Sequence, residues 1–276
     1  MMPDTPPAGP GTPLPGNADD LLYAVQDGIA RVTFNRPQAR NAMLFSMYER
    51  LAAICAEIEA DPSIRVLLLT GAGDKAFAAG TDISQFRAFA TPQDALDYEA
   101  RIDRVLGALE RLRVPTIAAI AGACTGGGAG MAACCDLRIA AANARFGFPV
   151  ARTLGNCLSM ANYSRLAALL GPARVKDLVF TARLIEAPEA HAIGLVSEVL
   201  PDAAALSARA TALATLVASH APLTLRATKE ALARIRDRAA PGEADKDLIL
   251  MCYMSADFRE GMDAFLTKRS PVWQGK

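Results

Sequence analysis

The sequence predicts an α/β fold whose carboxyl-terminal part is helical. Up to about residue 145, short apolar runs of strand length alternate with segments of helical periodicity, as layered α/β folds require. Two of these strands are followed by glycine-containing turns. After Gly155, helical patterns at about 158–170, 173–180, 203–219, 222–238 and 245–267 are interrupted by only one expected strand, near 195–199. We therefore expect one domain with a helical extension, in preference to two independent domains, with an α/β core over 19–200 and a helical region over 201–276.

The first structural element is predicted to be an antiparallel hairpin. Residues 21–25 and 30–34 are short apolar runs, and they flank Asp27 and Gly28. An Asp-Gly pair between two such runs is a strong hairpin signal. A helix should follow, because apolar residues recur at helical spacing over 44–58.

The next elements continue the alternation of strand and helix. Residues 65–70 form a continuous apolar run suited to a strand buried on both faces. Thr91 is placed to cap a helix that has Pro92 at its first position and Asp94 at its third. Residues 115–120 predict the next strand, the glycines after it open another helix, and 137–140 predict one more strand.

Composition excludes several classes of function. With 52% hydrophobic residues the chain is not globally disordered, and 29 basic against 29 acidic residues leave no net charge to attract nucleic acid or an anionic membrane. Six cysteines without a Cys-x-x-Cys pair fit neither a zinc site nor a disulfide framework, which favours a reducing cytoplasm. His191 and His220 have no other good ligand nearby in sequence, so no metal site is expected.

Two segments need separate interpretation. Residues 1–18 read as a disordered tail, because the first seventeen hold six prolines and three glycines and contain no apolar signal region. Residues 114–135 form a stretch of 22 residues without a charge, which is long enough to cross a bilayer as a helix. Pro115 and five glycines divide that stretch, so we expect a buried strand leading into a buried helix.

The two glycine-containing turns are the candidate ligand-binding features. Gly71-x-Gly73 follows a strand but lacks the third glycine and the immediate helix of a dinucleotide site, so that function is not favoured. Residues 78–82 (Ala-Ala-Gly-Thr-Asp) let a ligand approach the main chain closely. Residues 122–130 place glycines at a helix start without the Lys-Ser/Thr of a phosphate loop. Either run can simply serve close packing, but together they suggest two N–H donors that converge on one oxygen, as in an oxyanion hole.

Several ordered motifs resemble the enoyl-CoA hydratase/isomerase (crotonase) superfamily. They cover the chain from about residue 20 to its end. The central ones are Phe-Ala-Ala-Gly-Thr-Asp-Ile at 77–83, Ala-Ile-Ala-Gly-Ala-Cys-Thr-Gly-Gly-Gly at 119–128, Cys-Asp-Leu-Arg-Ile-Ala at 135–140 and Ala-Arg-Phe-Gly-Phe-Pro at 144–149. The Asn-Arg-Pro element at 35–37 and the segments 190–196, 222–232 and 257–271 look like its other signatures.

The resemblance implies a crotonase-like spiral of ββα units with a carboxyl-terminal helical trimerisation region, so that residues 201–276 serve oligomerisation and cover the active site. It implies an acyl thioester of coenzyme A as the substrate, no tightly bound cofactor, and a homotrimer or homohexamer. The backbone N–H groups of Thr81 and Gly127 correspond to the two donors to the thioester oxygen. The substrate-binding positions implied in the same way are Ala39, Arg40, Ala78, Ala79, Gly80, Asp82, Ile83, Gly126, Gly130, Pro149 and Val150, with Phe265 and Lys268 reaching a neighbouring subunit's ligand.

The sequence departs from the family at two positions that matter for catalysis. Hydratases of the family carry glutamates at the positions of Gly130 and Val150, and isomerases commonly carry a carboxylate at the second. Neither residue here exchanges a proton, so the acid/base pair for hydration is missing. The segment from Val150 to Gly155 is also one residue longer than the family's usual spacing.

Polar residues near these positions are candidates to replace the glutamates. Arg152 suits a surface ion pair better than a substrate carboxylate anchor, and Asn156 is a further polar candidate. Cys157 is expected to be a small buried filler. Asp82 is expected to order its loop. The resemblance implies that Tyr98 and the acids Asp97, Glu99 and Asp103 lie on a helix near the pocket mouth, where we expect them to be solvated.

The sequence therefore predicts a cytoplasmic acyl-CoA-binding enzyme of the hydratase/isomerase type, with an oxyanion hole and unassigned proton chemistry. Decarboxylation of a carboxyacyl-CoA is an alternative, because loss of carbon dioxide itself creates the enolate without a general base. Arg152 and the missing glutamates would favour it. A non-catalytic acyl-CoA-binding protein is the alternative from another class. Thioester affinity without turnover would distinguish it.

Overall fold

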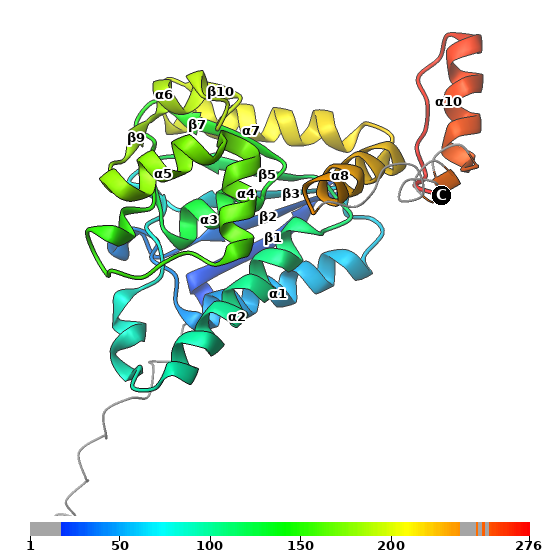
Figure 1. The fold of residues 1–276 in the computed structure, drawn as a ribbon. Coiled ribbons are helices and arrows are strands. Elements are labelled where there is room, and N and C mark those ends of the chain that lie inside the picture. Colours follow the sequence, from blue (N-terminus) through cyan, green and yellow to red (C-terminus); the bar gives the residue numbers. More distant parts are fainter. Residues whose placement is uncertain (1–17, 238–246, 248–249, 252–253) are drawn as a thin grey trace, which may run out of the picture.

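The structure is a computed structural model that describes residues 18–237, 247, 250–251 and 254–276 (Figure 1). The predicted tail, residues 1–18, lies outside the described residues except for Ala18, which starts the short 3₁₀ helix η1 (Ala18–Asp20). No helix among the residues described has the length and apolar character needed to cross a membrane.

A six-stranded sheet forms the centre of the molecule, in the order β1-β2-β3-β5-β7-β10. Only β1 and β2 pair antiparallel; every other neighbouring pair is parallel. Asp27 and Gly28 both have positive φ, at 52° and 73°, as the predicted tight hairpin requires. The strands are β1 (Leu21–Gln26), β2 (Ile29–Phe34), β3 (Val66–Gly71), β5 (Thr116–Ile120), β7 (Leu137–Ala141) and β10 (Glu198–Leu200).

A second sheet of four short strands runs in the order β4-β6-β8-β9. Its strands β4 (Ala76–Ala78), β6 (Ala123–Thr125) and β8 (Arg145–Gly147) are parallel, and β9 (Ile185–Glu186) is antiparallel to β8. Each of β3, β5 and β7 is followed in the chain by one strand of this second sheet and then by a helix. This repetition confirms the predicted spiral of ββα units.

Helices cover both faces of the central sheet (Figure 1). Alternate residues of β3 face opposite ways: Leu67 and Leu69 pack in one apolar cluster with α1, and Val66 and Leu68 pack in another with α7. The expectation of a strand buried on both faces is thus confirmed. The helices are α1 (Phe45–Ala60), α2 (Pro92–Glu110), α3 (Gly127–Cys134), α4 (Met160–Leu170), α5 (Pro172–Thr181), α6 (Ala187–Ala192), α7 (Ala203–Ala218), α8 (Pro222–Arg236) and α10 (Ala256–Thr267), with 3₁₀ helices η2 (Pro37–Ala39), η3 (Ile83–Ala88) and η4 (Pro149–Ala151).

The caps explain where two of these helices begin. Thr91 accepts a hydrogen bond from Asp94 N, and Asp94 accepts one from Thr91 N at 2.7 Å, so the predicted capping box is confirmed. The expected single helix over 245–267 is wrong, because a turn at 254–255 precedes α10. Ser255 Oγ accepts from Phe258 N at 2.9 Å there, which caps the start of a new helix.

The expectation of one strand between the helices of the carboxyl-terminal part is also wrong. The structure adds β9 and α6 before β10. The two residues of β9 are held only by their pairing with β8, which is a tertiary contact that local periodicity does not reveal. The first long helix of the region after residue 200, α7, packs on the central sheet through Leu206, Ala210, Leu213, Ala214 and Val217.

Candidate functional site

A cavity of about 190 Å³ lies at the carboxyl ends of the parallel strands β4, β6 and β8. Parallel α/β structures commonly bind ligands at this edge, because loops from several strands meet there. The wall is completed by one side of α2 and by the loop that follows η4. Predicted site residues that line the cavity are Ala79, Gly80, Thr81, Ile83, Gly126, Gly127, Gly130, Pro149, Val150 and Asn156.

Two segments, which we call the donor loops (79–81 and 126–127), touch each other at this edge. A Cβ on Gly80 would lie 3.3 Å from Thr125 O and 3.7 Å from Gly127 N. Gly80 and Gly126 have positive φ, at 101° and 52°, a conformation that favours glycine. Small residues are therefore needed here both for the backbone conformation and for close approach.

The N–H groups of Thr81 and Gly127 donate no hydrogen bond to any described residue. Met43 N donates to Gly80 O at 2.8 Å, and Asp82 N donates to Met43 O at 2.9 Å. Met43 thus pairs with the residues on either side of Thr81 and leaves the N–H of Thr81 without an acceptor. Gly127 is the first residue of α3, where N–H groups lack an acceptor within the helix. Two unpaired donors on adjacent loops beside a cavity suit a ligand oxygen that carries or develops negative charge.

Three hydroxyl groups in a row connect the first donor loop to helices α1 and α2. Thr81 Oγ1 lies 2.9 Å from Tyr48 Oη and 2.9 Å from Tyr98 Oη, within hydrogen-bonding distance of both. Tyr48 is fully buried on α1, whereas Tyr98 on α2 lines the cavity. Burial raises the pKa of both phenols, so they remain neutral donors at ordinary pH.

The carboxylate of Asp82 anchors the chain directly after the first donor loop. Its carboxylate accepts hydrogen bonds from Ser84 N at 3.1 Å and Ser84 Oγ at 2.7 Å, and it pairs with Arg36 at 3.1 Å. Burial would raise the pKa of Asp82, but the hydrogen bonds from Ser84 and Arg36 outweigh it and lower that pKa. The group is thus a charged anchor, and it does not line the cavity.

Gly130 and Val150, the two positions where family hydratases carry glutamate, both line the cavity. A Cβ on Gly130 would lie 3.5 Å from Asn162 Oδ1 and 3.5 Å from Leu106 Cδ1, which are ordinary contacts. There is thus room for a side chain at Gly130. Neither residue can transfer a proton.

The prediction of a solvated face on α2 is wrong for three of its four residues. Tyr98 and Glu99 line the cavity and are half-buried, and Asp103 accepts from Ser159 Oγ at 2.6 Å. Only Asp97 is exposed. Burial, and then the negative charge of Asp103, raise the pKa of Glu99. The sequence placed these residues on one helix but could not show that the helix lies against the donor loops.

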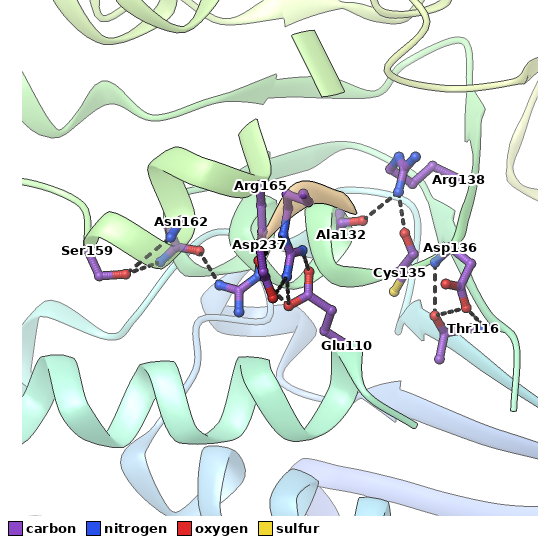
Figure 2. Close-up of polar contacts among 11 residues, drawn as sticks. Glu110, Thr116, Ala132, Cys135, Asp136, Arg138, Ser159, Asn162, Arg165 and Asp237 are labelled. Carbon is purple, nitrogen blue, oxygen red and sulfur yellow. Dashed lines mark hydrogen bonds and ion pairs between the residues drawn. The ribbon is translucent and has the colours of Figure 1, made fainter. Parts of the chain in front are cut away.

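Asn162 on α4 is a cavity residue that the sequence analysis missed. It belongs to a polar network that joins α4, α2 and α8, in which it lies between Ser159 and Arg165 (Figure 2). Arg165 Nη1 donates to Asn162 Oδ1 at 3.4 Å, and Arg165 Nε lies 3.0 Å from Glu110 Oε2. The Nε–H does not point at that oxygen, so the contact is an ion pair and not a hydrogen bond. Glu110 also pairs with Arg236 of α8. A single asparagine in a helix, without a motif around it, gave no signal in the sequence that would have identified it.

Other predicted site residues lie outside the cavity wall. Arg152 is exposed at the end of η4 and does not line the cavity. Ala78 is buried in β4, and Ala39 and Arg40 adjoin the first donor loop, where Ala79 N donates to Arg40 O at 3.1 Å. Lys268 is exposed beyond the end of α10, and the side chain of Phe265 lies outside the described residues.

Cys157 was expected to be buried, and this is wrong. It is exposed and lines the cavity, because the loop that carries it follows η4 and covers the cavity without entering the core. The cysteines at 55, 124, 134 and 135 are buried free thiols. In the described part of the chain, no three His, Cys, Asp or Glu side chains gather as metal ligands would.

Comparison with known proteins places the whole described chain in one family. The family model for enoyl-CoA hydratase/isomerase matches residues 24–276. A crotonyl-CoA hydratase of Syntrophomonas wolfei is 35% identical over 261 residues, covering 91% of this chain and 96% of the relative. A short-chain-enoyl-CoA hydratase of Clostridium acetobutylicum is 36% identical over 257 residues, covering 91% of this chain and 96% of the relative.

Solved structures agree with these sequence relatives. The crystal structure of an enoyl-CoA hydratase/carnithine racemase from Magnetospirillum magneticum has a TM-score of 0.87 at 35% identity, covering 94% of this chain and 97% of that one. The crystal structure of an enoyl-CoA hydratase from Bacillus anthracis has a TM-score of 0.83 at 30% identity, covering 93% of this chain and 100% of that one. The repeated ββα units, the family match and these relatives together show that the chain belongs to the enoyl-CoA hydratase/isomerase family of enzymes.

Proposed function

We propose that this enzyme binds a short-chain acyl-CoA thioester and stabilises its enolate through the N–H groups of Thr81 and Gly127. The observation that carries the proposal is the pair of unpaired N–H donors on touching loops beside the cavity. When an enolate forms, negative charge moves onto the thioester oxygen, and fixed donors stabilise that charge without reorganising. Losing one such donor typically costs about 2.7–4 kcal/mol of activation free energy.

The remaining ligand contacts follow from the same placement. Ala79, Gly80, Ile83, Gly126, Gly130, Pro149 and Val150, which line the cavity, would contact the acyl thioester, and Ala39 and Arg40 would lie along the coenzyme A portion. Ala78 and Asp82 lie outside the cavity wall and would act only by holding the first donor loop. The exposed Arg40 suits the phosphates of that portion, because guanidinium pairs well with phosphate oxygens. Coenzyme A enters as part of the substrate, and no tightly bound cofactor is required. The names of the hydratase relatives support a short enoyl group.

The reaction beyond the enolate differs from ordinary hydration. Addition of water needs one group to activate water and another to protonate carbon, and Gly130 and Val150 supply neither. Carboxyacyl-CoA decarboxylation loses one of its two supports, because Arg152 does not line the cavity, but it keeps the other, since neither Gly130 nor Val150 supplies a carboxylate there. A non-catalytic acyl-CoA-binding protein is the other alternative. Assays of the unmodified protein distinguish it from an enzyme, because it would bind the thioester without turnover.

Calorimetric titration with butyryl-CoA tests the proposal. We expect saturable binding by the unmodified protein, and weaker binding by Thr81→Pro, which removes one donor. Because the Thr81 N–H has no acceptor among the described residues, loss of the N–H itself breaks no internal hydrogen bond, and the loss of the Thr81 hydroxyl contacts with Tyr48 and Tyr98 is shared with Thr81→Ala. Thr81→Ala keeps the N–H and is the matched control, with circular dichroism to verify folding. Absence of binding by the unmodified protein, while a hydratase relative binds, would refute the proposal.

We also propose that the chain assembles as a homotrimer or homohexamer through its carboxyl-terminal helices, in the cytoplasm. Helix α10 lies apart from the central sheet (Figure 1). Large apolar side chains are exposed nearby in the chain, including Ile235 at 67%, Met254 at 64% and Val272 at 68%. Exposed apolar surface of this kind favours association. Lys268 does not line its own chain's cavity, which fits a contact with a neighbour's ligand.

Deletion of residues 257–276 tests this assembly. We expect the truncated chain to lose the trimer or hexamer and to bind butyryl-CoA more weakly, because the helix that would reach the neighbouring subunit is removed. Multi-angle light scattering at micromolar concentration measures the assembly. An unmodified protein that is monomeric under these conditions and still binds the ligand normally would contradict the proposal.

A further inference from the structure

Glu99 is the only ionisable carboxyl group among the described residues that line the cavity. No histidine, lysine or arginine is found among these described lining residues. The other polar side chains there are hydroxyl, amide or thiol groups, such as those of Thr125, Thr153 and Asn162. Proton transfer by a side chain in this cavity therefore has one obvious candidate.

Helix α2 holds Glu99 next to the donor loops. Tyr98, its neighbour in sequence, is within hydrogen-bonding distance of Thr81, the residue that carries the first donor N–H. Asp97 accepts from Gln93 and Asp103 accepts from Ser159, so both of these acids have partners. Glu99 has no hydrogen bond or ion pair with any described residue. Its carboxylate is thus available to a ligand, whereas its acidic neighbours are occupied.

The surroundings of Glu99 suit proton exchange. It is half-buried, and burial followed by the charge of Asp103 raises its pKa toward the range where proton uptake and release are both easy. The titratable groups that interact with it are Asp103 and Tyr98 on its own helix and Tyr48 on α1.

We propose that Glu99 is the catalytic base that removes and returns the α-proton of the bound acyl-CoA. The inference rests on the proposed function, because it requires the thioester oxygen to be held by Thr81 and Gly127. The α-carbon–hydrogen bond breaks, its proton passes to the Glu99 carboxylate, and its electron pair forms the enolate whose charge lies on the thioester oxygen. In the reverse step the carboxylic acid returns a proton to the α-carbon, so no other reactant is needed.

Exchange of the α-protons of butyryl-CoA in D₂O, followed by proton NMR, tests this assignment. We expect the unmodified protein to exchange them and Glu99→Gln to do so at least about 10²-fold more slowly, the usual contribution of a positioned base. Glu99→Asp should retain part of the rate, since it keeps the carboxylate on a shorter side chain. Asp97→Asn, an exposed acid on the same helix, is the matched control and should exchange normally. Thermal unfolding checks that every variant is folded.

Calorimetric binding of butyryl-CoA separates the two levels of inference. If the unmodified protein does not bind the thioester, the proposed function fails. If it binds but exchanges no α-proton, or if Glu99→Gln exchanges at the normal rate, thioester binding stands and the role of Glu99 is refuted. A Glu99→Gln variant that binds much more weakly but exchanges normally when saturated would make Glu99 a specificity residue instead of the base.

Discussion

Gly128 and Gly130 are two residues apart on α3, and their surroundings are of opposite kinds. A Cβ on Gly128 would lie 2.0 Å from the main-chain oxygen of Ala78, whereas a Cβ on Gly130 would meet only side-chain atoms at 3.5 Å. The first glycine lets the helix approach the strand that leads to the first donor loop. The second leaves space in the cavity where a longer side chain would fit.

This contrast separates the two halves of the site. The donors are main-chain groups, and packing of backbone against backbone fixes them. The proton chemistry depends on side chains that project into open space, and these can change without disturbing the fold. A chain can therefore keep its donor loops without both glutamates, and the proposed role of Glu99 would supply the acid from another element.

The largest expected effect is on hydration of crotonyl-CoA. At saturating substrate we expect a rate about 10²–10⁴-fold below that of an ordinary hydratase, because acid/base assistance at 130 and 150 is missing. The double substitution Gly130→Glu with Val150→Glu should raise the rate, provided that the extra residue before Gly155 has not displaced the loop. The pair Gly130→Gln with Val150→Gln matches it in size and should not. An unmodified protein that hydrates at the ordinary rate would show that another group does this chemistry.

A direct test of the contrast compares alanine at the two glycines. Gly128→Ala forces a shift against Ala78 O and should lower the free energy of unfolding by about 1–3 kcal/mol, as overpacking typically does. Gly130→Ala should be neutral or slightly stabilising, because alanine is favoured over glycine within helices by up to about 1 kcal/mol. Urea unfolding of both variants measures the difference. Equal destabilisation would mean that the two positions are packed alike.

A smaller effect is expected for the hydroxyl chain behind the first donor loop. Tyr98→Phe removes the contact with Thr81 and should cost about 1 kcal/mol of stability, the usual net contribution of a hydrogen bond. Tyr163→Phe is the control, because Tyr163 makes no side-chain hydrogen bond with a described residue. Thermal unfolding of the two variants should differ accordingly. If both behave alike, the Tyr98 hydroxyl contributes nothing to holding the loop.

The smallest effect concerns pH. The pKa of Glu99 is raised on folding, so the folded state binds its proton more tightly than the unfolded state does. As pH rises from the ordinary pKa of a glutamate to the raised pKa of Glu99 in the folded protein, the free energy of unfolding therefore falls. Glu99→Gln should be more stable than the unmodified protein at pH 7 but not at pH 4. Denaturant unfolding at the two pH values measures this difference. The same gain at both pH values would point to packing and not to charge.

Several features of the fold could be predicted from sequence because their causes are local. The Asp27-Gly28 turn, the Thr91 cap and the two-sided apolar run of β3 each depend on residues a few positions apart. The donor loops were also predictable, since short runs of small residues after strands indicate that a ligand or another segment can approach the main chain closely. The short strands β4, β6, β8 and β9 were not identified individually, because pairing between distant segments creates them.

The sequence by itself determined the alternation of strands and helices, the two glycine-containing turns after strands, and the absence of a carboxylate at 130 and 150. Only the tertiary structure decided which side chains share the cavity. It brought Glu99 and Asn162 to the wall, left Arg152 at the surface and exposed Cys157. The physical reason is that periodicity gives the face of a helix on which a residue lies, whereas the element against which that face packs depends on contacts far away in sequence.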